Sequence, residues 1–237
     1  MRSSAVLVLI TSLGFATSVE AQSAISTFPS RFSFGGDVVL SQPKSEFAAN
    51  VGNGYGFDVN GLFGLDPAGV FSLRADFGGI QYGRETKRIP SAVTGRIRYD
   101  LETDNRIGFG SIGAQLQVPD GWFRPYANAA IALTDFYTQS SLSSPDVSFQ
   151  ETNTNQSDVS HAWIFGGGIK IPFGRYSAGA LNIGARYFYG GRATYLTKGD
   201  IVDLPDGSVI LNTRESKTDL VLWQVGASFT IPRSTGH

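Results

Sequence analysis

The sequence predicts an all-β fold, a single eight-stranded antiparallel up-and-down barrel. Eight segments alternate apolar and polar residues with a period of two, which is the spacing of a strand and not of a helix. None of the 237 residues falls in a segment with the period of an amphipathic helix. Long polar connections alternate with tight turns, so we expect the strands to pair in chain order.

The first four strands are expected at residues 31–40, 54–65, 71–82 and 96–118. The tetrad Asp66-Pro67-Ala68-Gly69 is a tight turn before the third strand, and residues 84–95 are a charged connection after it. Within the third strand the apolar face changes parity across Gly78-Gly79, which predicts a glycine bulge there. The fourth strand changes parity in the same way near Gly110-Ser111.

The other four strands are expected at residues 122–138, 160–171, 180–193 and 219–231. Turns at residues 119–121 and 172–174 are short. The connections at residues 139–159 and 194–218 are long and polar, and the second contains Asp206-Gly207, which predicts a small hairpin. The long connections thus follow the odd-numbered strands, so they gather at one end of the barrel.

The N-terminal residues predict a secretory signal peptide at 1–21, followed by one barrel domain at 22–237. Arg2 is positive, residues 5–16 are apolar, and Val19 and Ala21 place small residues at the two positions that a signal peptidase reads. The apolar run is shorter than the roughly 20 residues of a membrane-spanning helix. The chain has no cysteine, so the exported protein is expected to be stable without disulfide bonds.

The composition favours a barrel that crosses a membrane. Mean hydropathy is −0.04 and charged residues make up 16%, as expected where lipid-facing residues alternate with interior ones. Short periplasmic turns opposed to long extracellular loops are typical of a bacterial outer-membrane barrel, with outer-membrane lipids as partners. Aromatic residues near both strand ends fit two interfacial girdles. The formal net charge of −1 argues against a nucleic-acid partner.

The last strand carries a pattern of its own: Gln224, Gly226, Phe229 and Ile231 follow the spacing polar, glycine, hydrophobic, hydrophobic. With this pattern and with the phrases SLRADFGGIQYG, FRPYANAAIAL and GGRATYLTKGDIVDLPDGS, the chain resembles the eight-stranded outer-membrane β-barrel families, which include the OmpA transmembrane domain and OmpX. The resemblance implies insertion by the barrel-assembly machinery, with those four residues as the assembly signal. The six-residue tail after the signal, at 232–237, departs from the family pattern.

Charged residues lie on the face that we expect to line the barrel. They are Asp37, Asp58, Arg74, Asp76, Lys170 and Arg186, accompanied by Asn60, Asn182 and Gln224. Side chains alone fill an eight-stranded barrel, and buried charges must be paired. The sequence therefore predicts an interior polar network that plugs the barrel. The alternative is an ion gate, in which Arg74 or Arg186 changes its carboxylate partner.

These features predict an integral outer-membrane barrel with a structural or surface-interaction role. A narrow channel for ions or small solutes is the first alternative, and a secreted lipocalin-like carrier of an apolar ligand is the second. No enzyme activity is expected, because Ser160 and His161 are adjacent on a strand and point to opposite faces. No cofactor or metal is expected either: Asp200, Asp203 and Asp206 lack calcium-loop spacing and are expected to be solvated loop charges. The sequence identifies no extracellular ligand or partner.

Overall fold

A computed structural model describes residues 32–90, 98–144, 147–173, 178–204 and 208–231. The predicted signal peptide at 1–21, the Asp206-Gly207 turn and the tail after Ile231 lie outside these residues, so they stay predictions.

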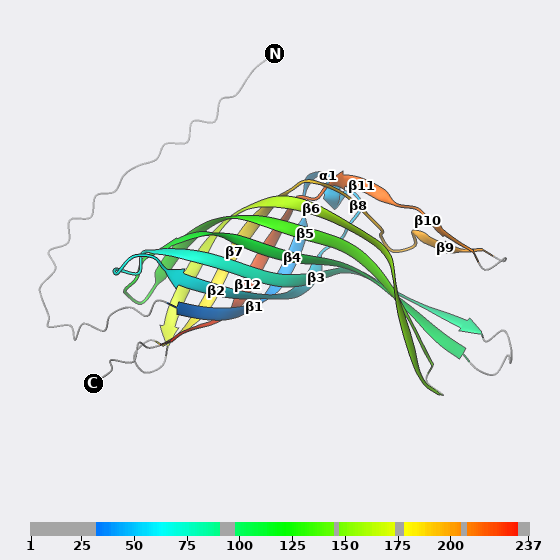
Figure 1. Ribbon diagram of the computed structural model, residues 1–237, viewed down its shortest axis with the longest axis horizontal. Coiled ribbons are helices and arrows are strands. Elements are labelled where there is room, and N and C mark those ends of the chain that lie inside the picture. Colours follow the sequence, from blue (N-terminus) through cyan, green and yellow to red (C-terminus); the bar gives the residue numbers. More distant parts are fainter. Residues whose placement is uncertain (1–31, 91–97, 145–146, 174–177, 205–207, 232–237) are drawn as a thin grey trace, which may run out of the picture.

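Eight long strands close into one barrel, in the order β1-β12-β7-β6-β5-β4-β3-β2 (Figure 1). Every neighbouring pair is antiparallel, and the first and last strands meet in a register that sets Val38 opposite Val225. The predicted eight-stranded up-and-down barrel is confirmed. Its strands are β1 Phe32–Pro43, β2 Gly54–Gly64, β3 Phe71–Pro90, β4 Arg98–Gln117, β5 Arg124–Ser144, β6 Val147–Phe173, β7 Gly179–Gly190 and β12 Leu220–Thr230.

The connections hold the remaining elements. Helix α1 (Ser45–Ala48) follows β1, and two small sheets stand between β7 and β12. One sheet pairs β8 (Arg192–Tyr195) with β11 (Arg214–Lys217), and the other pairs β9 (Ile201–Asp203) with β10 (Val209–Leu211). No helix among the described residues is both long and apolar enough to cross a membrane.

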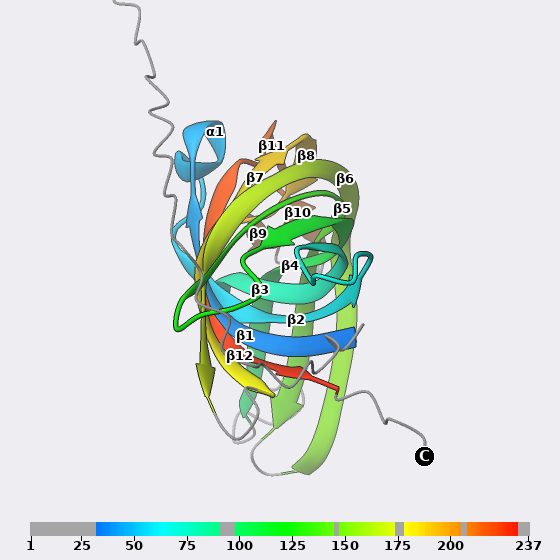
Figure 2. The same cartoon turned by 90° about the vertical axis from the view of Figure 1, so that its left-hand side faces the viewer.

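The tight turn before β3 is held by one aspartate. Asp66 accepts hydrogen bonds from the backbone N–H groups of Val70 at 3.1 Å and Phe71 at 2.6 Å. Gly69 adopts a φ of 72°, which favours glycine. The turn lies at the end of the barrel where β1 begins and β12 ends, and Ile231 N–H donates to the Phe32 carbonyl there (Figure 2).

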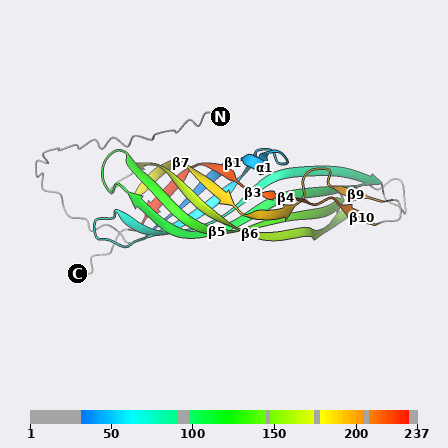
Figure 3. The same ribbon diagram turned by 90° about the horizontal axis from the view of Figure 1, so that it is seen from above.

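Four strands continue beyond the rest of the barrel at the opposite end. The β2–β3 pairing stops at Tyr55 and Gln81, whereas β3 and β4 stay paired as far as Pro90 and Arg98. Likewise β6 leaves β7 at Ala162 but follows β5 until Ser144 pairs with Val147. We call this projection, residues 82–90, 98–105, 138–144 and 147–156, the arm (Figures 1 and 3).

The arm corrects the prediction of loops at residues 84–95 and 139–159. Most of these residues are strand. They are rich in Ser, Thr, Asn and charged residues because neither face of a sheet standing clear of the barrel needs an apolar stripe. Period-two alternation in hydrophobicity therefore disappears although the strands continue.

The predicted glycine bulges are also wrong. From Phe77 opposite Gly110 to Gln81 opposite Arg106 the β3–β4 register is continuous, and a shift occurs only between Gln81 and Gly83. Apolar residues change parity for another reason: the interior of the barrel is polar near the tight turns and apolar near the arm. Ile80, for example, points inward and is 2% exposed, whereas Phe77 points outward and is 64% exposed.

The outer surface carries the apolar residues of the predicted membrane belt. Exposed aliphatic side chains on its middle include Val38, Val59, Ile112, Ile131 and Val225. Exposed aromatic residues gather near the tight turns, namely Phe32, Phe63, Phe71, Trp122, Phe123, Phe173 and Phe229. A second set lies toward the arm, namely Tyr55, Trp163, Tyr189 and Trp223. Aromatic residues at two levels match the two interfaces of a bilayer.

Candidate functional site

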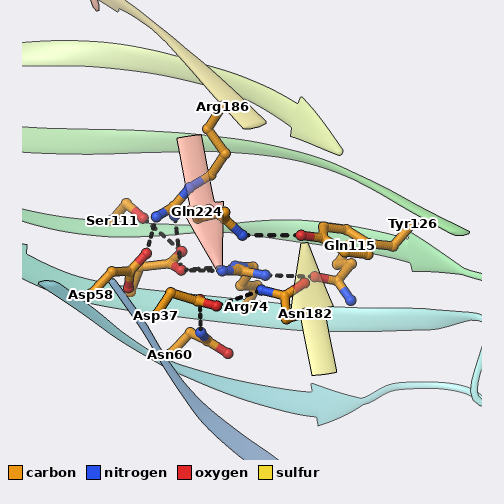
Figure 4. A network of polar contacts seen from close by, with 11 residues as sticks. Asp37, Asp58, Asn60, Arg74, Ser111, Gln115, Tyr126, Asn182, Arg186 and Gln224 are labelled. Atoms are coloured by element: carbon orange, nitrogen blue, oxygen red, sulfur yellow. Dashed lines mark hydrogen bonds and ion pairs between the residues drawn. The ribbon is translucent and has the colours of Figure 1, made fainter. Parts of the chain in front are cut away.

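The polar half of the lumen contains an ionic cluster centred on Arg186 of β7. Its guanidinium pairs with Asp58 of β2 and lies 2.9 Å from a carboxylate oxygen of Asp76 on β3. Arg186 is 1% exposed, and Asp58 and Asp76 are equally buried. These contacts cross the barrel, so they join strands that are not neighbours in the sheet (Figure 4).

Arg74 completes the cluster from β3. Its Nε and Nη2 donate to one oxygen of Asp76 at 2.8 and 2.6 Å, and its Nη1 donates to Gln115 Oε1 at 2.8 Å. Ser111 Oγ donates to the other oxygen of Asp76 at 3.0 Å. Asp76 thus serves two arginines and a hydroxyl, which is how a carboxylate without solvent can stay charged.

Asp37 is held by amides. Its two oxygens accept hydrogen bonds from Asn60 Nδ2 at 3.1 Å and from Asn182 Nδ2 at 2.7 Å. Nearby, Gln224 Nε2 donates to the Tyr126 hydroxyl at 3.0 Å (Figure 4). These residues fill the space beside the ionic cluster without joining it through an ion pair.

Lys170 lies apart from the ionic cluster, toward the tight turns. Its Nζ donates to Gln117 Oε1 at 3.2 Å and stands 5.7 Å from the centroid of the Tyr126 ring. The structure therefore brings four of the six predicted network residues into one cluster and leaves Asp37 and Lys170 outside it. Ser111, Gln115 and Tyr126 were missed, although their inward parity on β4 and β5 is a signal that could have found them.

An apolar layer closes the lumen above the ionic cluster. It consists of inward residues from most strands: Val39, Ile80, Ile107, Phe109, Ile164, Phe188 and Leu222. The rings of Phe109 and Phe188 meet at 5.5 Å, and the Arg186 guanidinium lies about 6 Å from both rings. The guanidinium thus faces carboxylates on one side and aromatic rings on the other.

Helix α1 covers the mouth of the lumen with one aromatic side chain. Phe47 is 1% exposed, and its ring meets those of Tyr82, Phe136 and Tyr195 at 6.1, 5.9 and 5.1 Å. The Tyr82 hydroxyl donates to the Leu196 carbonyl at 3.0 Å, which fixes the last loop over the same place. We call these four aromatic residues the mouth cap.

The four residues of the predicted assembly signal have different surroundings. Gln224 is buried in the lumen, whereas Phe229 and Ile231 are exposed on the outer surface near the tight turns. A Cβ at Gly226 would collide with the Gly36 carbonyl oxygen, so this position needs glycine for the close approach of β12 to β1. Their role as a signal remains a prediction.

The alternative sites outside the lumen take ordinary structural roles. Ser160 is buried and its hydroxyl donates to the Arg192 carbonyl at 3.0 Å, whereas His161 is exposed on the other face. Asp200 is not the solvated charge that was predicted: it is 5% exposed and accepts two hydrogen bonds of 2.9 Å from Arg214. Thr197 also donates to it, because the loop folds around this carboxylate. Within the described ranges, no group of three or more His, Cys, Asp or Glu could hold a metal.

In lipid, a β-sheet satisfies all of its backbone hydrogen-bonding groups only when it closes into a barrel. A closed barrel with an apolar belt outside and charges inside is therefore suited to cross a membrane. By its fold and outer surface, the chain is a bacterial outer-membrane β-barrel protein of the eight-stranded type. The same faces argue against the secreted carrier, which needs the reverse arrangement.

Solved structures with this fold are similar to the chain at low sequence identity. OprG from Pseudomonas aeruginosa gives a TM-score of 0.50 at 11% identity, over 87% of this chain and 98% of that one. Neisserial surface protein A gives 0.47 at 14% identity, over 85% and 98%. AlkL in DMPC bilayers gives 0.43 at 14%, over 94% and 100%. No protein-family model and no curated protein matches the chain. At such identity the likeness to OprG shows the fold alone.

Proposed function

We propose that this outer-membrane protein is a surface-interaction barrel, in which a filled barrel anchors the arm and the arm binds a partner outside the cell. The observation that carries the proposal is the arm itself. Four strands stay paired beyond the last residues that β2 and β7 contact, so the sheet extends past the membrane belt, where its edge strands β3 and β6 no longer pair with β2 and β7. A barrel that only spanned the membrane would need no such projection.

The two edges of the arm differ in chemistry. The β3 edge carries Arg84, Lys87 and Arg88 and ends at Pro90, and charges and proline of this kind discourage strand pairing. The last loop also contacts this edge, since Lys87 Nζ donates to the Ile201 carbonyl at 3.2 Å.

The β6 edge is open by comparison. Residues 147–156 contain no lysine, arginine or proline, and this part of β6 pairs only with β5 among the described residues. Backbone N–H and C=O groups on such an edge can pair with an added strand. The partner we propose is therefore an extended polypeptide segment that adds to β6.

The lumen supports this function over a channel. A solute would have to pass the ionic cluster, then the apolar layer and then the mouth cap, all of which contain side chains packed to nearly complete burial. Among the described residues, Ser160 is buried and donates to the Arg192 carbonyl whereas His161 is exposed on the other face, which supports a non-enzymatic role because the two do not form a nucleophile–base pair.

Shortening the arm tests the proposal. Ser140 pairs with Asn153, so replacing residues 141–152 by Asn-Gly makes a two-residue hairpin that removes most of the β6 edge. Arg84 pairs with Asp104, so replacing residues 85–103 by Asn-Gly shortens the other hairpin as a matched control. The wild-type protein in nanodiscs is used to select peptides from a displayed random library.

We expect the selected peptides to alternate in strand-like patterns, to lose binding to the variant lacking 141–152 and to keep binding to the control. Equal binding to the wild type and to the variant lacking 141–152 would show that the β6 edge is not the interaction surface.

A further inference from the structure

Two cations face each other inside the lumen near its periplasmic end. Arg124 begins β5, Lys170 lies near the end of β6, and the two are partners in the register of this strand pair. Lys170 is 8% exposed, and Arg124 shares the inward parity of the buried Tyr126. Cβ atoms of directly opposed residues lie about 5 Å apart. The two side chains therefore leave the sheet next to each other, on the same inward face.

Among the described residues, no carboxylate oxygen lies within 4.0 Å of a side-chain nitrogen of either cation. Lys170 donates to the neutral Gln117 amide, although an ammonium carries three donors. Arg124 Nε is buried and has no hydrogen-bond acceptor. Two kinds of cationic hydrogen-bond donor, a planar guanidinium and an ammonium, thus come together here with unused donor groups.

The carboxylates described inside the lumen, Asp37, Asp58 and Asp76, are engaged with other partners. On the other side of Lys170, its register partner on β7 is Asn182, which donates to Asp37. The second oxygen of Asp37 is taken by Asn60. Asp58 and Asp76 belong to the ionic cluster around Arg186. Lys170 is buried beside a second cation and has no carboxylate partner among the described residues, which is unfavourable, so negative charge from outside the described chain would stabilise the pair.

We propose that Arg124 and Lys170 form a binding site for a small oxyanion of the class of inorganic phosphate. A guanidinium binds two oxygens of such an anion through its fork, and an adjacent ammonium binds a third as a point charge. The Tyr126 ring, 5.7 Å from Lys170 Nζ, holds the ammonium in place. Arg124 is only half-buried, so a small anion can enter from the periplasmic end.

The experiment titrates the folded protein in detergent micelles with inorganic phosphate, against sodium chloride at matched ionic strength. Binding is followed by calorimetry and by the line width of the phosphate ³¹P resonance. The variants are Lys170→Met, Arg124→Gln and, as a control, Lys198→Met, which removes an exposed loop lysine. Heat-modifiable migration on gels establishes that each variant is folded.

We expect saturable binding to the wild type, unchanged binding to Lys198→Met, and an affinity at least about tenfold lower for Lys170→Met and for Arg124→Gln, because each loses a charge-assisted contact. Because Lys170→Met and Arg124→Gln each remove one of the two cations, either variant alone can test the site if the other does not fold. Failure of the wild type to bind phosphate would overturn the proposal. So would equal affinity in the wild type and in the folded lumen variants.

Discussion

Arg186 lies between Asp58 and Asp76 and has almost no solvent exposure. Its partners come from β2 and β3, on the far side of the barrel from β7. Removing the guanidinium would leave Asp58 buried without its cation, which is far more costly than removing both partners.

We predict that Arg186→Met destabilises the folded barrel by about 3–5 kcal/mol, and that Arg186→Met combined with Asp58→Asn recovers most of the loss. Urea unfolding in lipid vesicles, followed by tryptophan fluorescence, measures both. If the loss in free energy of unfolding of the double variant equals the sum of the losses in Arg186→Met and Asp58→Asn alone, Arg186 and Asp58 are not coupled as their contact indicates.

Asp200 is the residue at which pH should act on the extracellular loop. Burial alone would raise the pKa of Asp200, but hydrogen bonds from Arg214 and Thr197 outweigh it and hold the pKa below its ordinary value. A carboxyl group with a depressed pKa stabilises the fold above its unfolded pKa of about 4 and loses this contribution as pH falls through the folded pKa. The loop should therefore loosen below about pH 4.

We predict that hydrogen exchange at the Thr197 amide, corrected for intrinsic rates, accelerates below about pH 4 in the wild type. In Asp200→Asn the Thr197 amide should exchange faster at neutral pH. The increase should correspond to a loss of about 1–2 kcal/mol of local stability, after allowance for the half-exposed Arg214. Acidification should not change the rate further. A wild type without acid dependence would contradict the role given to this carboxylate.

At the scale of elements, β12 combines two functions in one strand. Inward residues such as Gln224 contribute to the polar half of the lumen, while Phe229 lies outward against Phe34 and Phe173 at ring distances of 6.0 and 6.3 Å. The exposed aromatic residue contributes little to the core of the monomer, so its placement suits recognition and the lipid interface.

We predict that Phe229→Ser with Ile231→Ser reduces the fraction of protein inserted into the outer membrane severalfold, because the expected assembly signal is lost. Membrane fractionation and heat-modifiable migration measure insertion. Phe34→Ser with Val38→Ser on β1 is the matched control, since it removes exposed apolar residues from the neighbouring strand. An equal defect in both variants would assign the effect to lipid contact and not to a signal.

At the scale of the whole molecule, the lumen has two layers with different physics. The ionic cluster joins distant strands through charge, and the apolar layer with the mouth cap separates it from the extracellular end. Each layer obstructs the lumen, so opening requires more than an exchange of carboxylate partners.

We predict that the wild type produces no steady ion conductance in planar bilayers, and that Arg74→Gln leaves it silent because the apolar layer stays closed. Truncating that layer by Phe109→Ala and Phe188→Ala together should still give no open pore while the ionic cluster is intact. Steady single-channel steps in the wild type would favour the narrow channel instead.

Much of the architecture was predictable because it depends on local patterning. Alternation along residues 54–65 or 219–231 identifies a strand and its two faces wherever the strand lies, and turns that contain proline and glycine, such as Asp66-Pro67-Ala68-Gly69, separate neighbouring strands. The β3, β5 and β6 parts of the arm escaped prediction because a strand wetted on both faces has no alternation to detect, whereas the β4 part lies within the predicted strand at 96–118. The supposed bulge at Gly78-Gly79 arose because a change in the lumen's polarity mimics a change in strand parity.

The sequence by itself determined that this chain forms eight barrel strands in chain order, with an apolar outer face and six charged residues expected inside, because these properties follow from period, composition and turn chemistry. Tertiary structure alone decided which charges meet: Arg186 pairs across the lumen with Asp58, whereas Lys170 lies beside Arg124. Those pairings depend on strand register and barrel closure, which bring together residues that no local pattern connects.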